Sequence, residues 1–342
     1  MSLKNDDATV LADPQWIPTH LNPDRKQVQF AWVARDSHSR ISFLADQYLR
    51  DLAPPTVWLS GDKLGSGSAI SAPAHYIFHS AFCCSTLIAS ALDLKGVAMG
   101  LKEPQILNEL AAVFRARALP GGLLSGVTGL LARPFGPGES VIVKPSNEAN
   151  ILAGPLLRQD GRTRAILLYA PLPKFLRSVA RKGMWGRIWG RRLHALLRHD
   201  PGPDFGFTEA ELFQQTDLQI AATAWLLHHH HFAALAAEFP AQVRMLDSET
   251  FLGHREASLA QIGDHFGLKL DRAVWARVAQ GDVFKQHSKE IGRAFAEHEG
   301  NQADALPAFL QEEVEMVGTW AQSLAGHIGL SLEPPSSLRI NP

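Results

Sequence analysis

The residues best suited to chemistry lie in a short segment that joins an apolar run to a helical stretch. The segment reads Phe78-His79-Ser80-Ala81-Phe82-Cys83-Cys84-Ser85-Thr86-Leu87. A turn that opens a helix presents unpaired backbone N–H groups and the positive end of the helix dipole, and the hydroxyls of Ser85 and Thr86 add donors. The pattern predicts a site for a phosphate or sulfate group. The alternative is that both hydroxyls only cap the helix.

This segment departs from the phosphate-binding pattern G-x-x-x-x-G-K-[ST]. His79 and Cys84 stand at the two glycine positions, and Ser85 stands at the lysine position. The missing lysine argues against ordinary nucleoside triphosphate hydrolysis. Cys83 and Cys84 are poor candidates for a nucleophile, because a reactive thiol needs a positioned base and only His79 is close in sequence.

The elements around this segment alternate between short apolar runs and helical stretches. We expect strands at residues 75–79, 97–101, 140–143, 165–169 and 242–246. Helices are expected at residues 85–94, 106–117, 216–238 and 258–266, with another from residue 174, and the Gly- and Pro-rich stretch 119–138 is expected to form a loop. Such alternation predicts a mostly parallel sheet with covered faces, in which ligands bind beyond the carboxyl ends of the strands.

Composition limits the classes of protein to consider. The 342 residues are 46% hydrophobic, which is enough for a sizeable core, and the formal net charge is −1, so no global positive field favours nucleic acid as a partner. Cys83 and Cys84 are the only cysteines, and being adjacent they are poor disulfide partners. With no long apolar run, we expect a cytoplasmic protein.

We divide the chain into an irregular N-terminal arm (1–70), a central α/β domain (71–270) and a helical C-terminal extension (271–342).

Three segments together resemble the sulfotransferase family, whose members use the sulfate donor PAPS (3'-phosphoadenosine 5'-phosphosulfate). The turn ending Cys84-Ser85-Thr86-Leu87 is similar to the family's 5'-phosphosulfate loop. Residues 164–178 are similar to its 3'-phosphate segment, and residues 243–252 with 259–268 are similar to its later strand, turn and helix end. The resemblance implies a P-loop-like three-layer sandwich with about five central strands. It also implies sulfuryl transfer to a hydroxyl or amine of a small acceptor.

The resemblance assigns donor contacts to Phe82, Cys83, Cys84, Ser85 and Thr86 in the loop. The first three stand where the family has Arg, Ser and Gly. In the second segment Ser178 matches a serine that binds the 3'-phosphate, whereas Ala170 stands where an arginine is expected. The departures therefore fall on the charged contacts.

Sulfuryl transfer also needs a base for the acceptor's proton, and cations around the leaving phosphate. Some bacterial and sugar sulfotransferases use a glutamate as base, so the resemblance makes Glu103, at the end of the second strand, our candidate. The alternatives are that Glu103 caps the next helix or pairs with Lys102. Lys144, at the end of the third strand, is the nearby cation best placed to replace the missing loop charge, unless it is an ordinary solvated lysine. His287 is the second candidate base, or part of an exposed polar helix.

A strongly basic segment spans residues 174–198, with eight Lys or Arg and no acidic residue. One helical face within it carries Trp185, Trp189, Leu193 and Leu196. The segment therefore predicts a basic amphipathic helix. It could hold the 3'-phosphate, attract an anionic acceptor or contact a membrane surface, or be a solvated face over a packing stripe. The four consecutive histidines at 228–231 lie inside an apolar helix and point in different directions, so we expect no metal.

Two other functions stay open at this point. A P-loop-type nucleotide-binding protein or kinase would fit the turn, although the absent lysine speaks against it. A noncatalytic descendant that binds an anion or a partner would fit the loss of both family arginines. The sequence does not indicate the acceptor or the oligomeric state.

Overall fold

The computed structural model describes residues 6–38, 40–64, 72–285, 306–332 and 338. The chain forms two compact units, and each is built from separate stretches of sequence. The first comprises Met1–Phe78, Ser85–Ala165 and Glu256–Phe295, and the second comprises His79–Cys84, Ile166–Arg255 and Ala296–Pro342. This division differs from the three consecutive segments 1–70, 71–270 and 271–342 that we expected.

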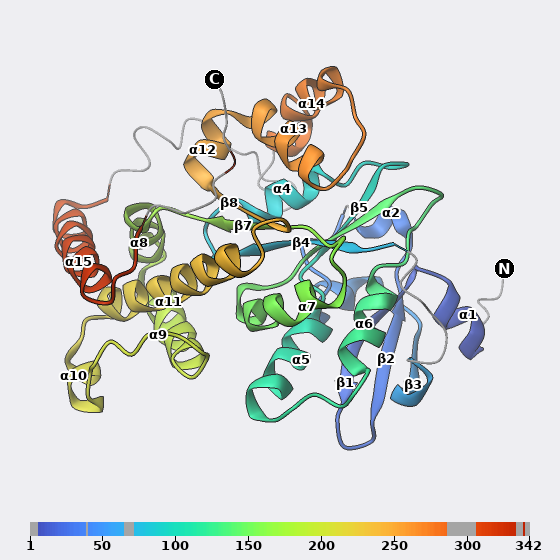
Figure 1. Ribbon diagram of the computed structural model, residues 1–342, viewed down its shortest axis with the longest axis horizontal. Coiled ribbons are helices and arrows are strands. Elements are labelled where there is room, and N and C mark those ends of the chain that lie inside the picture. Colours follow the sequence, from blue (N-terminus) through green and yellow to red (C-terminus); the bar gives the residue numbers. More distant parts are fainter. Residues whose placement is uncertain (1–5, 39, 65–71, 286–305, 333–337, 339–342) are drawn as a thin grey trace. The chain divides into compact units, whose positions relative to one another are not determined.

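The N-terminal part of the first unit is a three-stranded antiparallel sheet (Figure 1). Its strands are β1 (Trp16–Asn22), β2 (Gln27–Trp32) and β3 (Thr56–Ser60), in the order β1-β2-β3. Trp16 and Phe30 are fully buried in its core. The expected irregular arm was therefore wrong for these residues. The register of β1 and β2 shifts between Pro18 and His20, which interrupts the alternation by which a strand is recognised.

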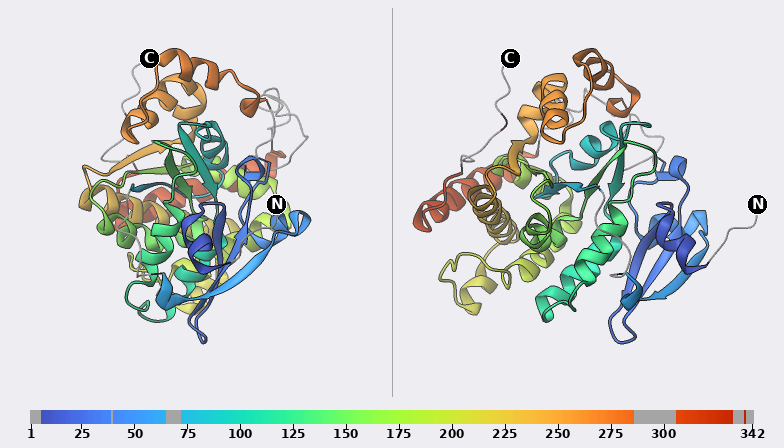
Figure 2. Two further views of the ribbon diagram at one scale, coloured as in Figure 1. Left: turned by 90° about the vertical axis from the view of Figure 1, so that its right-hand side faces the viewer. Right: turned by 45° about the vertical axis from the view of Figure 1, so that its right-hand side comes forward.

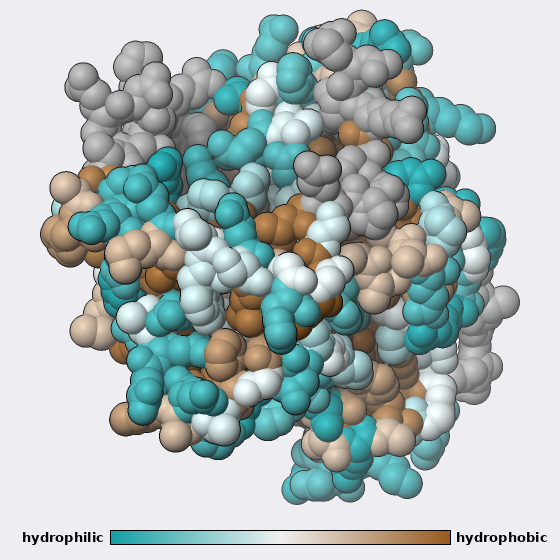
Figure 3. Space-filling view, turned by 60° about the vertical axis from the view of Figure 1, so that its left-hand side comes forward, coloured by the Kyte–Doolittle hydropathy of each residue, from teal (hydrophilic) through white to brown (hydrophobic). Residues whose placement is uncertain are grey.

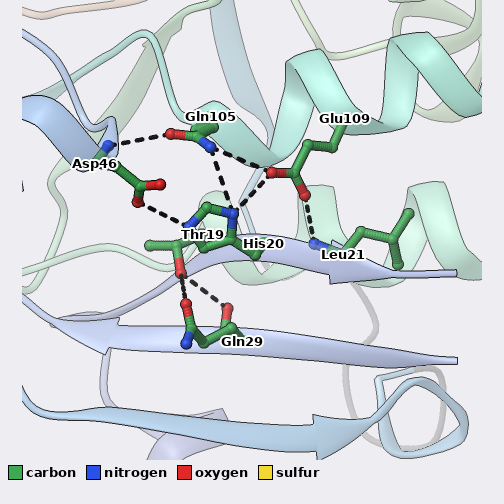
Figure 4. Close-up of polar contacts among 7 residues, drawn as sticks. All are labelled: Thr19, His20, Leu21, Gln29, Asp46, Gln105 and Glu109. Carbon is green, nitrogen blue, oxygen red and sulfur yellow. Dashed lines mark hydrogen bonds and ion pairs between the residues drawn. The ribbon is translucent and has the colours of Figure 1, made fainter. Parts of the chain in front are cut away.

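A charged cluster fastens this sheet to the rest of the first unit (Figure 4). His20 of β1 lies between Glu109 of α5 (Gln105–Ala116), at 2.7 Å, and Asp46 of α3 (Asp46–Leu49), at 2.8 Å. The second carboxylate oxygen of Glu109 accepts a hydrogen bond from the Leu21 backbone N–H. The hydrogen bond to Glu109 is the largest cause that raises the pKa of His20 to about 9, so the imidazole is cationic at neutral pH.

The five expected strands form one sheet in the order β5-β6-β4-β7-β8. They are β4 (Ala74–His79), β5 (Ala98–Lys102), β6 (Ser140–Lys144), β7 (Ala165–Tyr169) and β8 (Val243–Asp247). Strand β6 is parallel to both of its neighbours, β4 and β5. Every residue of β4, β5 and β7 is buried, as expected for parallel strands covered on both faces. The predicted α/β class with a mostly parallel five-stranded sheet is confirmed.

The first unit has further helices. They are α1 (Asp7–Ala12), α2 (Arg35–His38), α4 (Ser85–Ala91), α6 (Leu123–Leu131), α7 (Ala153–Gln159), α13 (Arg255–His265) and α14 (Arg272–Ala279), with 3-10 turns at Arg50–Leu52, Gly61–Lys63, Asn147–Leu152 and Asp282–Phe284. Helix α6 lies within 119–138, where we expected a loop. It forms because Val127, Leu130 and Leu131 bury one face, which outweighs the low helix propensity of its glycines.

The described helices of the second unit differ in length. They are α8 (Leu172–Arg181), α9 (Gly183–Leu197), α10 (Glu209–Gln214), α11 (Asp217–Glu238), α12 (Ser248–Gly253) and α15 (Ala308–His327). The longest of these are α11 and α15. Helix α11 packs against α9 and α15, and α15 also packs against α8 (Figures 1 and 2). None of the described helices is both long and apolar enough to span a lipid bilayer.

Candidate functional site

The turn after β4 has a strained backbone. Ala81, Phe82 and Cys84 have φ of 71°, 51° and 62°, a region that non-glycine residues rarely adopt. Each such residue costs about 1–3 kcal/mol and persists only where its surroundings hold it in place. Helix α4 begins at Ser85, directly after this turn. Loops that mix left- and right-handed residues turn consecutive N–H groups toward one side, which makes a concave site for an anion.

Contacts with the end of β7 hold the turn in this shape within the second unit. The backbone N–H of Ser80 donates to the Leu168 carbonyl at 3.0 Å, and the Cys83 thiol donates to the same carbonyl at 3.5 Å. The N–H of Ala170 donates to the Ser80 hydroxyl at 3.3 Å. Ser80 and Cys83 are buried, whereas Phe82 and Cys84 are partly exposed. The inner residues therefore anchor the turn, and its tip reaches the surface.

The Thr86 hydroxyl, on the first turn of α4, is buried and has no hydrogen-bond partner within the described residues. Thr86 is only 1% exposed, so water in bulk does not reach it. Leaving a buried polar group unsatisfied costs about 1–3 kcal/mol, and such groups call for a ligand, an ordered water or another explanation. Ser85, its neighbour, is 5% exposed.

Phe82 stands where the resembled family has an arginine, yet a cation lies over its ring. The Lys182 ammonium is 5.6 Å from the centroid of Phe82 and 5.3 Å from that of Trp185. The Phe82 ring also packs edge-on against Trp189, with centroids 4.8 Å apart, and against Phe175. Lys182 belongs to the basic segment 174–198, but nothing in the sequence connects it with the turn. No spacing rule links the two, because the approach depends on the break between α8 and α9.

The second predicted donor segment lies on β7 and α8. Ser178 is half-buried on α8, and its hydroxyl donates to the Lys174 carbonyl one turn earlier, at 2.8 Å. To donate to a phosphate, this hydroxyl has to leave that carbonyl. Ala170, at the position of the family's arginine, is fully buried, and its carbonyl accepts a hydrogen bond from the Trp225 indole at 2.8 Å. This position therefore carries no charge.

In the first unit the two predicted strand-end residues pair with each other. The Lys144 ammonium lies 2.5 Å from a Glu103 carboxylate oxygen, and the Glu103 N–H donates to the Lys144 carbonyl at 2.6 Å. The Lys144 side chain is fully buried, whereas that of Glu103 is 23% exposed. Glu103 also has a positive φ of 49°. Pro104, rather than Glu103, stands at the N-cap of α5, and the Glu103 carboxylate contacts Lys144.

This contact also bears on the role of Lys144. A buried ammonium needs a counter-ion, and Glu103 provides one. The ammonium of Lys144 therefore lies against the Glu103 carboxylate within the first unit. Its predicted role at the turn stays a prediction.

Further charged groups lie close by; of these, only Lys102 was considered from the sequence, as a possible partner of Glu103. Lys102 is the register partner of Lys144 and is 4% exposed, and burial lowers its pKa to about 8. Arg35 contacts Asp93 at 2.8 Å, and burial raises the pKa of that carboxyl. A polar residue at the end of an apolar run was the only available signal for Lys102.

His287, the second candidate base, lies outside the described residues.

The four histidines of α11 are divided between core and surface. His228 and His229 are both 2% exposed, and His230 and His231 are partly buried. His229 stacks on Trp225, with ring centroids 4.5 Å apart, and burial lowers its pKa to about 4. In the described part of the chain no group of three or more metal-ligating side chains is arranged to hold an ion.

Comparison with solved structures gives likenesses at low sequence identity. The sulfotransferase domain from the curacin biosynthetic pathway is 12% identical, with a TM-score of 0.41, over 76% of this chain and 99% of that domain. Retinol dehydratase in complex with androsterone and the inactive cofactor PAP is 14% identical, with a TM-score of 0.36, over 75% of this chain and 82% of its own. Its complex with retinol and PAP is 14% identical, with a TM-score of 0.36, over 81% and 89%. No family model and no curated protein sequence matches the chain.

Proposed function

We propose that the chain binds PAPS at the turn formed by residues 82–86 and transfers its sulfuryl group to a hydroxyl or amine of a small acceptor. The observation that carries the proposal is the buried, unpartnered Thr86 hydroxyl directly after a strained turn. A sulfate or phosphate oxygen would satisfy that hydroxyl, and the N–H groups at the start of α4 would bind the same anion. The order of the three sulfotransferase-like segments in the sequence supports the choice of donor.

The reaction forms one bond and breaks another at sulfur. The acceptor oxygen or nitrogen attacks the sulfur atom while the bond from sulfur to the bridging phosphate oxygen breaks, so that PAP leaves. Negative charge grows on that phosphate, and donors aimed at it lower the barrier. Lys182, beside Phe82, is our candidate cation for this charge, in place of the absent arginine.

Glu103 is our proposed base. The Lys144 ammonium contacts one oxygen of its carboxylate, and the side chain is 23% exposed, so an acceptor can approach it. Ser178 is our proposed contact for the 3'-phosphate, through a hydroxyl that now donates within its own helix.

Both cysteines are free thiols, which agrees with the reducing cytoplasm that we propose as the compartment.

One observation favours a second, noncatalytic function. The buried Ala170, bonded to Trp225, leaves the position of the second family arginine without charge. A charge-assisted hydrogen bond to phosphate contributes about 1.5–3 kcal/mol, so its loss weakens donor binding and favours a module that only senses an anion.

A turnover assay distinguishes the two functions. Purified protein is incubated with sulfur-labelled PAPS and a panel of small alcohols, phenols and amines, and release of PAP is followed. We expect PAP release that depends on an acceptor and that Glu103→Gln abolishes. The matched control is Glu148→Gln, an exposed glutamate of the first unit, which should keep full turnover. Turnover that survives in Glu103→Gln would show that Glu103 is not the base. PAP binding without any turnover would support the noncatalytic function.

A further inference from the structure

Helix α9 exposes a compact group of large apolar side chains. Met184, Trp185 and Ile188 are 72%, 59% and 44% exposed. Residues three and four positions apart on a helix lie side by side, so Ile188 is a neighbour of both Trp185 and Met184. We name Met184, Trp185 and Ile188 the α9 patch. On the face drawn in Figure 3, hydrophobic residues (brown) likewise reach the surface in patches among hydrophilic ones.

Packing on the opposite side of α9 fixes which residues face outward. A side chain at Gly190 would meet the β-carbon of Ala221 at 2.8 Å, so glycine lets α9 lie close against α11. One turn later, Leu193 and Leu197 pack against Ala224 and Leu227. These contacts hold one side of α9 against α11. The α9 patch lies on the opposite side of the helix and therefore faces solvent.

Positive charge surrounds the α9 patch in sequence. Several of the eight basic side chains in residues 174–198 contact carboxylates of described residues; these pairs include Lys174 with Glu249, Arg187 with Glu313, Arg191 with Asp217 and Arg198 with Glu209. The exposed Arg192, one turn after Ile188, has no carboxylate within salt-bridge distance among the described residues. Lys182 lies over the Trp185 ring. Cations thus stand at both ends of the patch.

We propose that the α9 patch docks on an anionic lipid surface. Protruding Trp, Met and Ile side chains would enter the boundary between headgroups and acyl chains, where indole rings are enriched. Lys182 and Arg192 would then lie at the level of the phosphates, and a basic side chain near an anionic surface strengthens binding by about fivefold. An acidic protein surface would satisfy the cations, but it offers no apolar layer for three neighbouring exposed side chains. This inference goes beyond the proposed sulfuryl transfer and does not depend on it.

Sedimentation with lipid vesicles tests the docking, with the full-length protein and no nucleotide. One set of vesicles is phosphatidylcholine, and the other is an equimolar mixture of phosphatidylcholine and phosphatidylglycerol. We expect binding to the anionic vesicles that falls with added salt, and at least tenfold weaker binding of Met184→Gln/Trp185→Gln/Ile188→Gln. Phe213→Gln, at an 86% exposed phenylalanine on α10, is the matched control and should bind like wild type. The replaced side chains are exposed, so thermal unfolding should be unchanged.

Fluorescence identifies the side chain that enters the lipid. Brominated acyl chains should quench tryptophan emission of the wild type on anionic vesicles, and Trp185→Phe should lose most of this quenching while it still binds. No binding to anionic vesicles, binding that the triple variant retains, or quenching that persists in Trp185→Phe would each overturn the proposal. Binding of the patch to an acidic protein but not to vesicles would also overturn it. Because no donor is present, none of these results bears on sulfuryl transfer.

Discussion

The Lys182 ammonium lies 5.6 Å from the centroid of the Phe82 ring. Phe82 is part of the strained turn before α4, so this contact brings a cation to a turn that has no basic residue of its own. A lysine from the break between α8 and α9 thus stands near the position at which the resembled family carries an arginine.

Removal of the Lys182 charge should weaken PAP binding. We expect Lys182→Gln to raise the dissociation constant by about tenfold or more, because a charge-assisted hydrogen bond to phosphate contributes about 1.5–3 kcal/mol. Calorimetric titration measures this directly. Lys269→Gln, at an exposed lysine of the first unit, is the control and should bind PAP like wild type. Equal PAP affinities of the Lys182 and Lys269 variants would show that Lys182 does not contact PAP.

Replacement of Thr86 should change stability and binding in opposite directions. Thr86→Val removes a buried hydroxyl that has no partner, so we expect the unliganded protein to unfold with a free energy about 1 kcal/mol higher. The same variant should bind PAP more weakly. Denaturant unfolding and PAP titration are compared with Thr319→Val, an exposed helical threonine. A destabilised Thr86→Val with normal PAP binding would show that the hydroxyl has a structural partner instead.

The Glu103–Lys144 pair should respond unequally to loss of either partner. Glu103→Gln removes the carboxylate that contacts a fully buried ammonium, whereas Lys144→Met leaves a carboxylate that is 23% exposed and can reach water. Breaking a buried pair costs about 3–5 kcal/mol, so we expect Glu103→Gln to approach that range and Lys144→Met to cost clearly less. Denaturant unfolding of both single variants and the double variant checks this order. A larger loss in Lys144→Met would contradict it.

The His20 cluster should make stability depend on pH. The pKa of His20 is raised to about 9, so the folded protein holds a proton that the unfolded chain releases near pH 6.5. Its contribution is complete below pH 6.5 and disappears as the pH rises through about 9. The cluster is partly exposed, so we expect a loss of about 1 kcal/mol across this window after allowance for solvent screening. Unfolding of the wild type and of His20→Gln at several pH values should converge near pH 9, and a constant difference between them would contradict the assignment.

Much of the central sheet could be predicted because its strands are short apolar runs that end at polar residues. Strand β7 was predicted at 165–169 and forms there, and β4, β5, β6 and β8 lie within one residue of the expected positions. Parallel strands buried on both faces produce this pattern directly. The three-stranded sheet and α6 were missed, because a bulge disrupts the alternation of β1 and glycines obscure the buried face of α6.

The site could be predicted only where neighbouring strand ends determine it. Lys102 and Lys144 are register partners on β5 and β6, so Glu103, one residue later, is within reach of Lys144. The approach of Lys182 to Phe82 had no signal in the sequence. It depends on a helix break at Gly183, with φ of 56°, and on the left-handed backbone of Phe82. Neither conformation can be read from residue types alone.

Calorimetric titration of the wild-type protein with PAP, beside 5'-AMP and Mg-ATP, shows whether the chain recognises the sulfate donor's nucleotide. We predict that PAP binds, that 5'-AMP binds at least tenfold more weakly because it lacks the 3'-phosphate, and that Ser178→Ala loses this difference. Ser323→Ala, an exposed serine with the same helical hydrogen bond to the preceding turn, should keep it. Binding of Mg-ATP without binding of PAP, or no binding of any of the three at millimolar concentration, would contradict the account.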